Sequence, residues 1–137
     1  MRIVLDSNVV VAAFATRGLC SDLFEVSVKE CEIVLSESLL DEINNTLKNK
    51  IKLPSAKINS ITEFLRQETI MVVPVSLPAA SCRDPADVKV LATAVAGSAQ
   101  VIVTGDEDLL ILRNFSNVQI LTPRELWSLL TRKKSDQ

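Results

Sequence analysis

The chain has 137 residues, of which 47% are apolar and 23% charged, and its formal net charge is -2. This length and mixture are typical of one globular domain, and a charge so close to zero neither indicates nor excludes a polyanionic partner. The sequence has no histidine and only three glycines. It therefore excludes a Ser-His-Asp triad, a histidine-ligated zinc site and a glycine-rich phosphate loop.

The predicted elements alternate between strands and helices along the chain. Short runs rich in β-branched residues predict buried parallel strands at 3–5, 33–35, 70–73, 101–103 and 118–121. Apolar residues at helical spacing predict helices near 9–15, 39–47, 58–65 and 88–95. Ser7 or Asn8 is expected to cap the first of these helices. Thr122-Pro123-Arg124-Glu125 has the pattern of a capping box at the start of a last helix.

This order predicts an α/β fold, a three-layer α/β/α sandwich with a mostly parallel central sheet of about five strands. A helical hairpin is expected after the second strand, between about 36 and 68. We expect residues 1–131 to form one domain and residues 132–137 to fray at the end of the last helix. The early apolar run 9–15 is too short to span a membrane, and it is not a targeting signal. The three cysteines lack paired spacing and are expected to be reduced thiols in a cytoplasmic protein.

Acidic residues occur where a parallel sheet would bind a ligand, at the carboxyl ends of its strands. Asp6 directly follows the first strand, and Asp106 follows the fourth after Thr104-Gly105. Asp87 lies near the start of the helix over 88–95, and Glu42 lies at the border of an apolar helix face. Each has an ordinary alternative: a helix acid for Glu42, a turn residue for Asp106, and a capping box for Asp84 to Asp87.

Together these four acids indicate a metal site, if the strands of Asp6 and Asp106 are neighbours. Four carboxylates in one crevice raise one another's pKa values, and a divalent cation relieves the conflict. An all-oxygen donor set without histidine or paired thiolates favours Mg²⁺ or Mn²⁺ over Zn²⁺. Such an ion can activate water for attack on a phosphodiester.

Four segments in order resemble the successive motifs of the PIN-domain ribonucleases, and most closely the VapC-like toxin components of bacterial toxin–antitoxin pairs. They are Ile3-Val4-Leu5-Asp6-Ser7-Asn8-Val9, Ser38-Leu39-Leu40-Asp41-Glu42-Ile43, Asp84-Pro85-Ala86-Asp87-Val88-Lys89-Val90-Leu91-Ala92-Thr93-Ala94, and Val101-Ile102-Val103-Thr104-Gly105-Asp106-Glu107-Asp108-Leu109-Leu110. The resemblance covers nearly the whole chain. It implies a Mg²⁺- or Mn²⁺-dependent endoribonuclease, a small antitoxin partner, and a homodimer or higher homo-oligomer.

The resemblance also implies the site residues. Asp6, Glu42, Asp87 and Asp106 would hold the catalytic metal. Ser7 or Thr104 would add a hydroxyl near metal or phosphate, and Asn8 would cap the first helix. Asp84 and Asp108 are extra acids: Asp84 is expected to cap a helix, Asp108 to start a short helix over 109–112, and either Asp106 or Asp108 to face the metal. The candidate RNA-binding patch is at the tip of the helical hairpin, with Arg66 a further candidate, and the alternative is a solvated turn; its lysines are Lys48, Lys50, Lys52 and Lys57.

Two other functions stay open at this stage. A phosphoacceptor or phosphatase-type α/β domain also has acids at its strand ends. However, the receiver type has paired acids after the first strand and a lysine after the last, and a haloacid-dehalogenase-like phosphatase has an acid where Asn8 stands. A catalytically silent PIN-like module that binds a protein partner is the second alternative.

Overall fold

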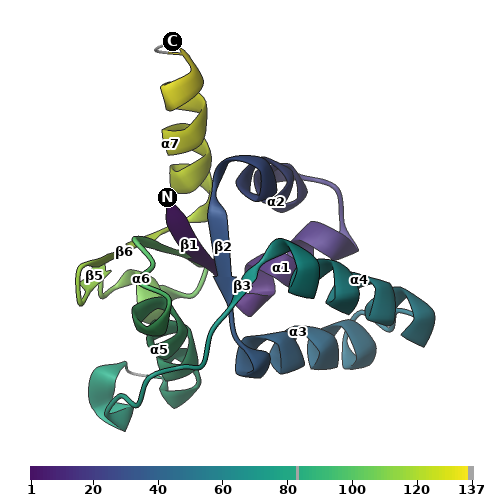
Figure 1. Cartoon of the computed structure of the whole chain (residues 1–137), viewed down its shortest axis with the longest axis horizontal. Coiled ribbons are helices and arrows are strands. Elements are labelled where there is room, and N and C mark those ends of the chain that lie inside the picture. The colour runs from purple at the N-terminus through teal and green to yellow at the C-terminus, as the bar shows by residue number, and fades with distance from the viewer. Residues whose placement is uncertain (83, 136–137) are drawn as a thin grey trace.

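The computed structural model describes residues 1–82 and 84–135, and a twisted sheet crosses its centre (Figure 1). The sheet has six strands in the order β3-β2-β1-β4-β6-β5. Neighbouring strands are parallel except for β5 and β6, which are antiparallel. The strands are β1 (Arg2–Leu5), β2 (Glu32–Leu35), β3 (Ile70–Met71), β4 (Val101–Val103), β5 (Asn114–Phe115) and β6 (Val118–Leu121). The predicted mostly parallel sheet is confirmed.

Helices connect these strands in chain order. They are α1 (Ser7–Ala15), α2 (Leu19–Glu30), α3 (Glu37–Asn49), α4 (Ser55–Glu68), α5 (Val88–Ala96), α6 (Glu107–Leu110) and α7 (Pro123–Ser135). Two short 3₁₀ turns, η1 (Ala79–Ser81) and η2 (Pro85–Asp87), precede α5. The expected helical hairpin after the second strand is the pair α3 and α4. None of the helices in the described ranges has the length and apolar character that crossing a membrane requires.

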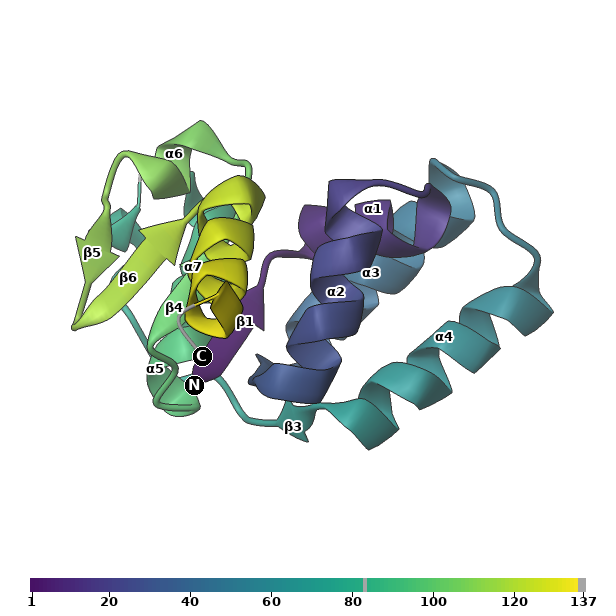
Figure 2. The same ribbon diagram turned by 90° about the horizontal axis from the view of Figure 1, so that it is seen from above.

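The helices cover both faces of the sheet. Helix α5 packs against β1, β2 and β4, whereas α2 packs against β2 and α7, and α7 packs against β6. Figure 2 shows α1 to α4 gathered toward one end of the sheet, and α5 and α6 toward the other end with β4, β5 and β6. Because both faces are covered, β1 and β2 are apolar after their first residues, Arg2 and Glu32, and Ile3, Val4 and Leu5 are at most 1% exposed. This is the predicted α/β/α arrangement.

Local capping fixes where the last helix begins. The backbone N–H of Thr122 donates to Glu125 Oε1 at 3.0 Å, and the backbone N–H of Glu125 donates to Thr122 Oγ1 at 3.1 Å. This reciprocal pair is the predicted capping box. Helix α7 continues to Ser135, past the expected end at residue 131, and residues 136–137 lie outside the described ranges.

Three elements differ from the sequence-based expectation. The strand predicted over 70–73 ends at Met71, because its partner β2 ends at Leu35 where α3 begins, and Val73 is 86% exposed. Helix α2 was not predicted, since only Leu23, Phe24 and Ser27 of its twelve residues are buried. Strand β5 was also missed; it joins β6 through a two-residue turn whose residues have positive φ.

Candidate metal and nuclease site

Asp6 lies where β1 meets α1, at the carboxyl edge of the sheet. Its Oδ1 accepts the backbone N–H of Ser7 at 2.7 Å, so Asp6 itself is the N-cap of α1. The expectation that Ser7 or Asn8 caps this helix is therefore wrong: the carboxylate one residue earlier already reaches the free N–H, Ser7 is buried and Asn8 is exposed.

Strand pairing brings the end of β4 beside Asp6. Leu5 pairs with Val103, and the backbone N–H of Asp6 donates to Val103 O at 2.9 Å. Thr104, which is fully buried, donates its hydroxyl proton to Asp6 Oδ2 at 2.7 Å and accepts the backbone N–H of Asp106 at 2.9 Å. The Thr104 hydroxyl therefore orients two of the predicted acids.

Asp106 is the N-cap of α6. Its Oδ1 accepts the backbone N–H of Asp108 at 2.8 Å, and α6 spans Glu107–Leu110. Asp108 was expected to start this helix, and that expectation is wrong because Asp108 lies within its first turn. The cap is two residues earlier, since a cap side chain accepts the N–H of the second or third helical residue.

Asp87 ends η2 and is only 7% exposed. Its Oδ2 is buried and has no hydrogen-bond partner within the described ranges. Burial, the charges of Asp106, Asp6 and Asp84, and a hydrogen bond to Asp106 together raise the pKa of Asp87 to about 7, and burial contributes most. An acid in this state is a strong ligand for a cation, because binding removes the cost of ionising it.

Asp6 interacts electrostatically with other predicted acids. Burial raises the pKa of Asp6, and the negative charges of Glu42 and Asp106 act in the same direction. The hydrogen bonds from Thr104 and Ser7 oppose this rise because they stabilise the carboxylate. The fold thus brings Glu42, Asp87 and Asp106, from three separate parts of the chain, within electrostatic range of Asp6.

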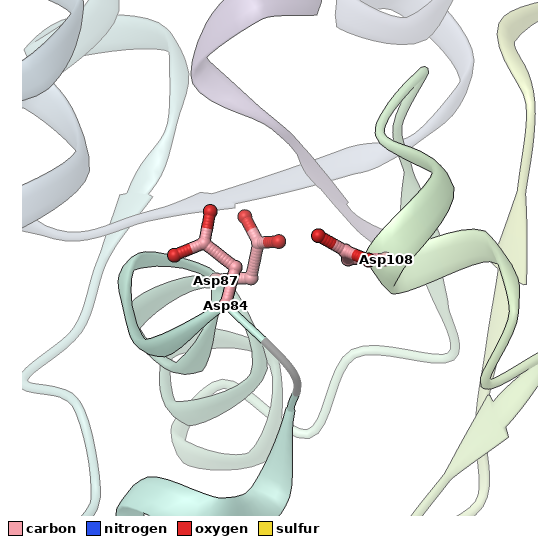
Figure 3. A group of neighbouring side chains, drawn as sticks. All are labelled: Asp84, Asp87 and Asp108. Carbon is pink, nitrogen blue, oxygen red and sulfur yellow. The ribbon is translucent and has the colours of Figure 1, made fainter.

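The two extra acids join the same cluster. One carboxylate oxygen from each of Asp84, Asp87 and Asp108 lies within 4.8 Å of the other two. Figure 3 shows the three carboxylates directed into a common space between η2 and α6. Asp84 also caps η2 as predicted, since its Oδ1 accepts the backbone N–H of Ala86 at 3.0 Å. The paired spacings Asp84/Asp87 and Asp106/Asp108 were the sequence signals for this wider cluster.

The residues present fit a hard divalent cation. The donors are carboxylate oxygens, and one of them is buried without a hydrogen-bond partner among the described residues. Burial, and to a lesser degree the charges of neighbouring acids, raises the pKa of Asp87 and Asp6. Oxygen-only sites of this kind suit Mg²⁺ or Mn²⁺. The candidate ligands are Asp6, Glu42, Asp84, Asp87, Asp106 and Asp108.

A hollow of about 480 Å³ adjoins the acids. Glu42 lines it together with other polar residues of α3, and Ala86 and Lys89 line the opposite wall. Of the lysines predicted to bind RNA, Lys50 lines this hollow; Lys48, Lys52 and Lys57 are exposed elsewhere on the hairpin. Lys89 was not singled out from the sequence, although it is two residues from Asp87.

Comparison with known proteins agrees with this geometry. The model of the PIN-domain family matches residues 2–108, which is most of the chain. The chain belongs to the PIN-domain family. PIN domains are generally nucleases, and the matched range contains all six acids. No curated protein matches this PIN domain in sequence.

Two solved structures share the PIN fold of the chain. The structure of VapBC2 from Rickettsia felis bound to a DNA fragment from their promoter has a TM-score of 0.58 at 16% identity. The structure of FitAcB from Neisseria gonorrhoeae has a TM-score of 0.54 at 17% identity. Each match covers 89% of this PIN domain and 98% of the other chain. At 16% and 17% sequence identity, the similarity to these two structures shows a shared fold.

Proposed function

We propose that this PIN domain is an endoribonuclease that depends on Mg²⁺ or Mn²⁺ and hydrolyses RNA phosphodiester bonds at its acidic cluster. The observation that carries the proposal is Asp87: it is nine-tenths buried, its Oδ2 has no hydrogen-bond partner among residues 1–82 and 84–135, and its pKa is raised to about 7 by burial and neighbouring acids. A buried acid beside other acids at the carboxyl ends of parallel strands is the expected property of a cation site.

Each residue has a role in this proposal. Asp6, Glu42, Asp87 and Asp106 hold the metal, and Thr104 fixes the orientation of Asp6 and Asp106 through its hydroxyl. A bound divalent ion would supply an activated water and charge compensation at the phosphate. Asp84 and Asp108 hold further negative charge next to Asp87, so they strengthen the attraction for cations at the same place.

Purified protein and a labelled RNA test the proposal. We expect cleavage with Mn²⁺ or Mg²⁺, none with EDTA, and no cleavage of the deoxy version of the same oligonucleotide. Asp6→Asn and Asp87→Asn should lose at least a hundredfold in rate. Asp22→Asn is the matched control, because Asp22 is an exposed acid on α2. Full activity in Asp6→Asn and Asp87→Asn would overturn the assignment of the site.

We further propose that the protein is the toxin of a toxin–antitoxin pair and acts in the cytoplasm, where its three cysteines stay reduced. Support comes from the motif resemblance to VapC-like toxins and from the fold shared with the VapBC2 and FitAcB structures. Induced expression should arrest growth in a host cell, and co-expression of a small protein encoded next to the gene should relieve the arrest. Growth unaffected by the active nuclease would contradict the toxin role.

A homodimer is the oligomeric state that the resemblance implies, and light scattering of the purified protein tests it. The match to the PIN-domain family gives no support to the phosphoacceptor and phosphatase alternatives. A folded protein that binds a partner but neither Mn²⁺ nor RNA would instead be the catalytically silent module.

A further inference from the structure

The hollow beside the acids follows one face of α3. Ser38, Asp41, Glu42, Asn45, Thr46 and Asn49 line it, and their spacing of three or four residues places them in one stripe along the helix. At 1.5 Å per residue, the stripe is about 17 Å long. The hollow is therefore an elongated groove that follows α3 from Ser38, past Glu42 at the acid cluster, to the end of the helix.

This stripe is the face of α3 that packing leaves available. Leu39, Leu40, Ile43 and Leu47 point into the core. A third face meets α4, where Thr62 donates its hydroxyl to Asn44 Oδ1 at 3.0 Å and Arg66 forms an ion pair with Glu37. Asn45 and Asn49 form no side-chain hydrogen bond within the described ranges, so their amides are available to a ligand.

Two cations border the groove. Lys50 lies at the end of α3, and Lys89 projects from the first turn of α5 on the opposite wall. Neither lysine forms an ion pair with another described residue. In a protein with a net charge of -2, two unpaired lysines beside a groove that opens at the acid cluster are a local site for an anion.

The two acids in the lining do not cancel this charge. Glu42 is a proposed metal ligand, so a bound cation neutralises it. Asp41 keeps its negative charge, because the nearby Arg66 is already paired with Glu37. The two positive charges of Lys50 and Lys89 outnumber this one remaining acid, so the groove can still attract phosphate.

We propose that this groove between α3 and α5 holds a single-stranded segment of the RNA substrate next to the scissile bond. Lys89 and Lys50 bind its phosphates, and Asn45 and Asn49 hydrogen-bond its sugars or base edges. The proposal rests on the ribonuclease function proposed above and states where the RNA substrate binds. No aromatic residue lines the groove, so affinity comes from the backbone charge and the amides rather than from base stacking.

Charge-neutral lysine variants test the proposed groove. We expect Lys50→Gln/Lys89→Gln to raise KM for a single-stranded RNA about tenfold, with kcat changed less than twofold, because the lysines bind RNA but do not contact the scissile bond. The slope of log affinity against log salt should decrease by about 1.4 for two lost phosphate contacts on a single strand. Lys50→Arg/Lys89→Arg should restore both values.

A matched control separates binding in the proposed groove from a general effect of charge. Lys29→Gln removes an exposed lysine of α2 that does not line the groove. The proposed groove is overturned if the double groove variant keeps the KM and salt slope of the wild type, or if Lys29→Gln weakens binding as much. Melting temperatures of all variants should agree within a few degrees, because all three lysines are exposed.

Different results would contradict the proposed RNA-binding groove and the proposed nuclease function. If the wild type cleaves RNA and the Lys50 and Lys89 variants cleave it equally well, the proposed RNA-binding groove is wrong and the proposed nuclease function stands. RNA binding that depends on Lys50 and Lys89, without cleavage in Mn²⁺ or Mg²⁺, overturns the nuclease function and leaves the proposed RNA-binding groove intact. Binding is measured by fluorescence anisotropy in EDTA with the full chain, so it does not depend on cleavage.

Discussion

Thr104 donates a 2.7 Å hydrogen bond to Oδ2 of Asp6, although 98 residues separate them in the sequence. The same hydroxyl accepts the backbone N–H of Asp106. One buried oxygen atom therefore couples the ends of β1 and β4 and holds two proposed metal ligands in place. Residues that orient metal ligands in this way typically contribute ten- to a hundredfold to affinity.

Replacing Thr104 by valine, which keeps the shape and removes the hydroxyl, should weaken Mn²⁺ binding about tenfold or more. The change removes the donor to Asp6 and leaves the N–H of Asp106 without its acceptor. It should also lower the free energy of unfolding by about 1–3 kcal/mol. Calorimetric titration with Mn²⁺ and urea unfolding measure the two effects. Thr104→Ser is the control, since it keeps the hydroxyl; equal Mn²⁺ affinity in Thr104→Val and wild type would contradict the orienting role.

The free energy of unfolding of the metal-free protein should fall as the pH rises from about 4 to about 7. The folded state holds the Asp87 proton up to about pH 7, whereas an unfolded chain releases it near the ordinary value of 3.8. Because the folded state binds more protons in this window, rising pH favours unfolding. Urea unfolding in EDTA at pH 5 and pH 8 measures the change. Mn²⁺ should therefore stabilise the protein more at pH 8 than at pH 5.

Asp87→Asn should stabilise the metal-free protein at pH 8, by on the order of 1–2 kcal/mol, while abolishing the response to Mn²⁺. The amide removes a buried charge, and within the part of the chain that the structure describes Oδ2 has no hydrogen-bond partner to lose. At pH 4 the variant and the wild type should have similar stability, because Asp87 is then neutral in the folded protein. A loss of stability at pH 8 would show that the Asp87 carboxylate is compensated within the protein itself.

Gly97→Ala should destabilise the protein by about 1–3 kcal/mol. A Cβ at Gly97 would lie 2.4 Å from Val34 Cγ1, where the end of α5 packs on β2. Gly105→Ala is the matched control, since a Cβ there meets nothing within 4 Å and should change stability little. Thermal unfolding measures both. Combining Gly97→Ala with Val34→Ala should recover part of the loss if the clash is its cause.

Where the sequence pattern was local and strong, it predicted the structure. The β-branched runs predicted the central strands, and the signals at Thr122 and Glu125 predicted the start of α7, because strand burial and capping depend on neighbouring residues. The turn before β6 was missed. In the structure its two residues, Ser116 and Asn117, both have positive φ, as a tight hairpin turn requires. Helix α2 was missed because its apolar pattern is short.

The sequence by itself excluded histidine chemistry and placed acids after its strands, where a parallel sheet binds ligands. Which acids lie closest together was decided only by the tertiary structure: Asp84, expected to cap a helix, and Asp108, left open as a metal ligand, converge with Asp87. The groove with Lys50 and Lys89 likewise exists only after α3 packs beside α5. The physical reason is that sequence spacing fixes the direction of a side chain within its own element, whereas its distance from residues on other elements depends on how the whole core packs.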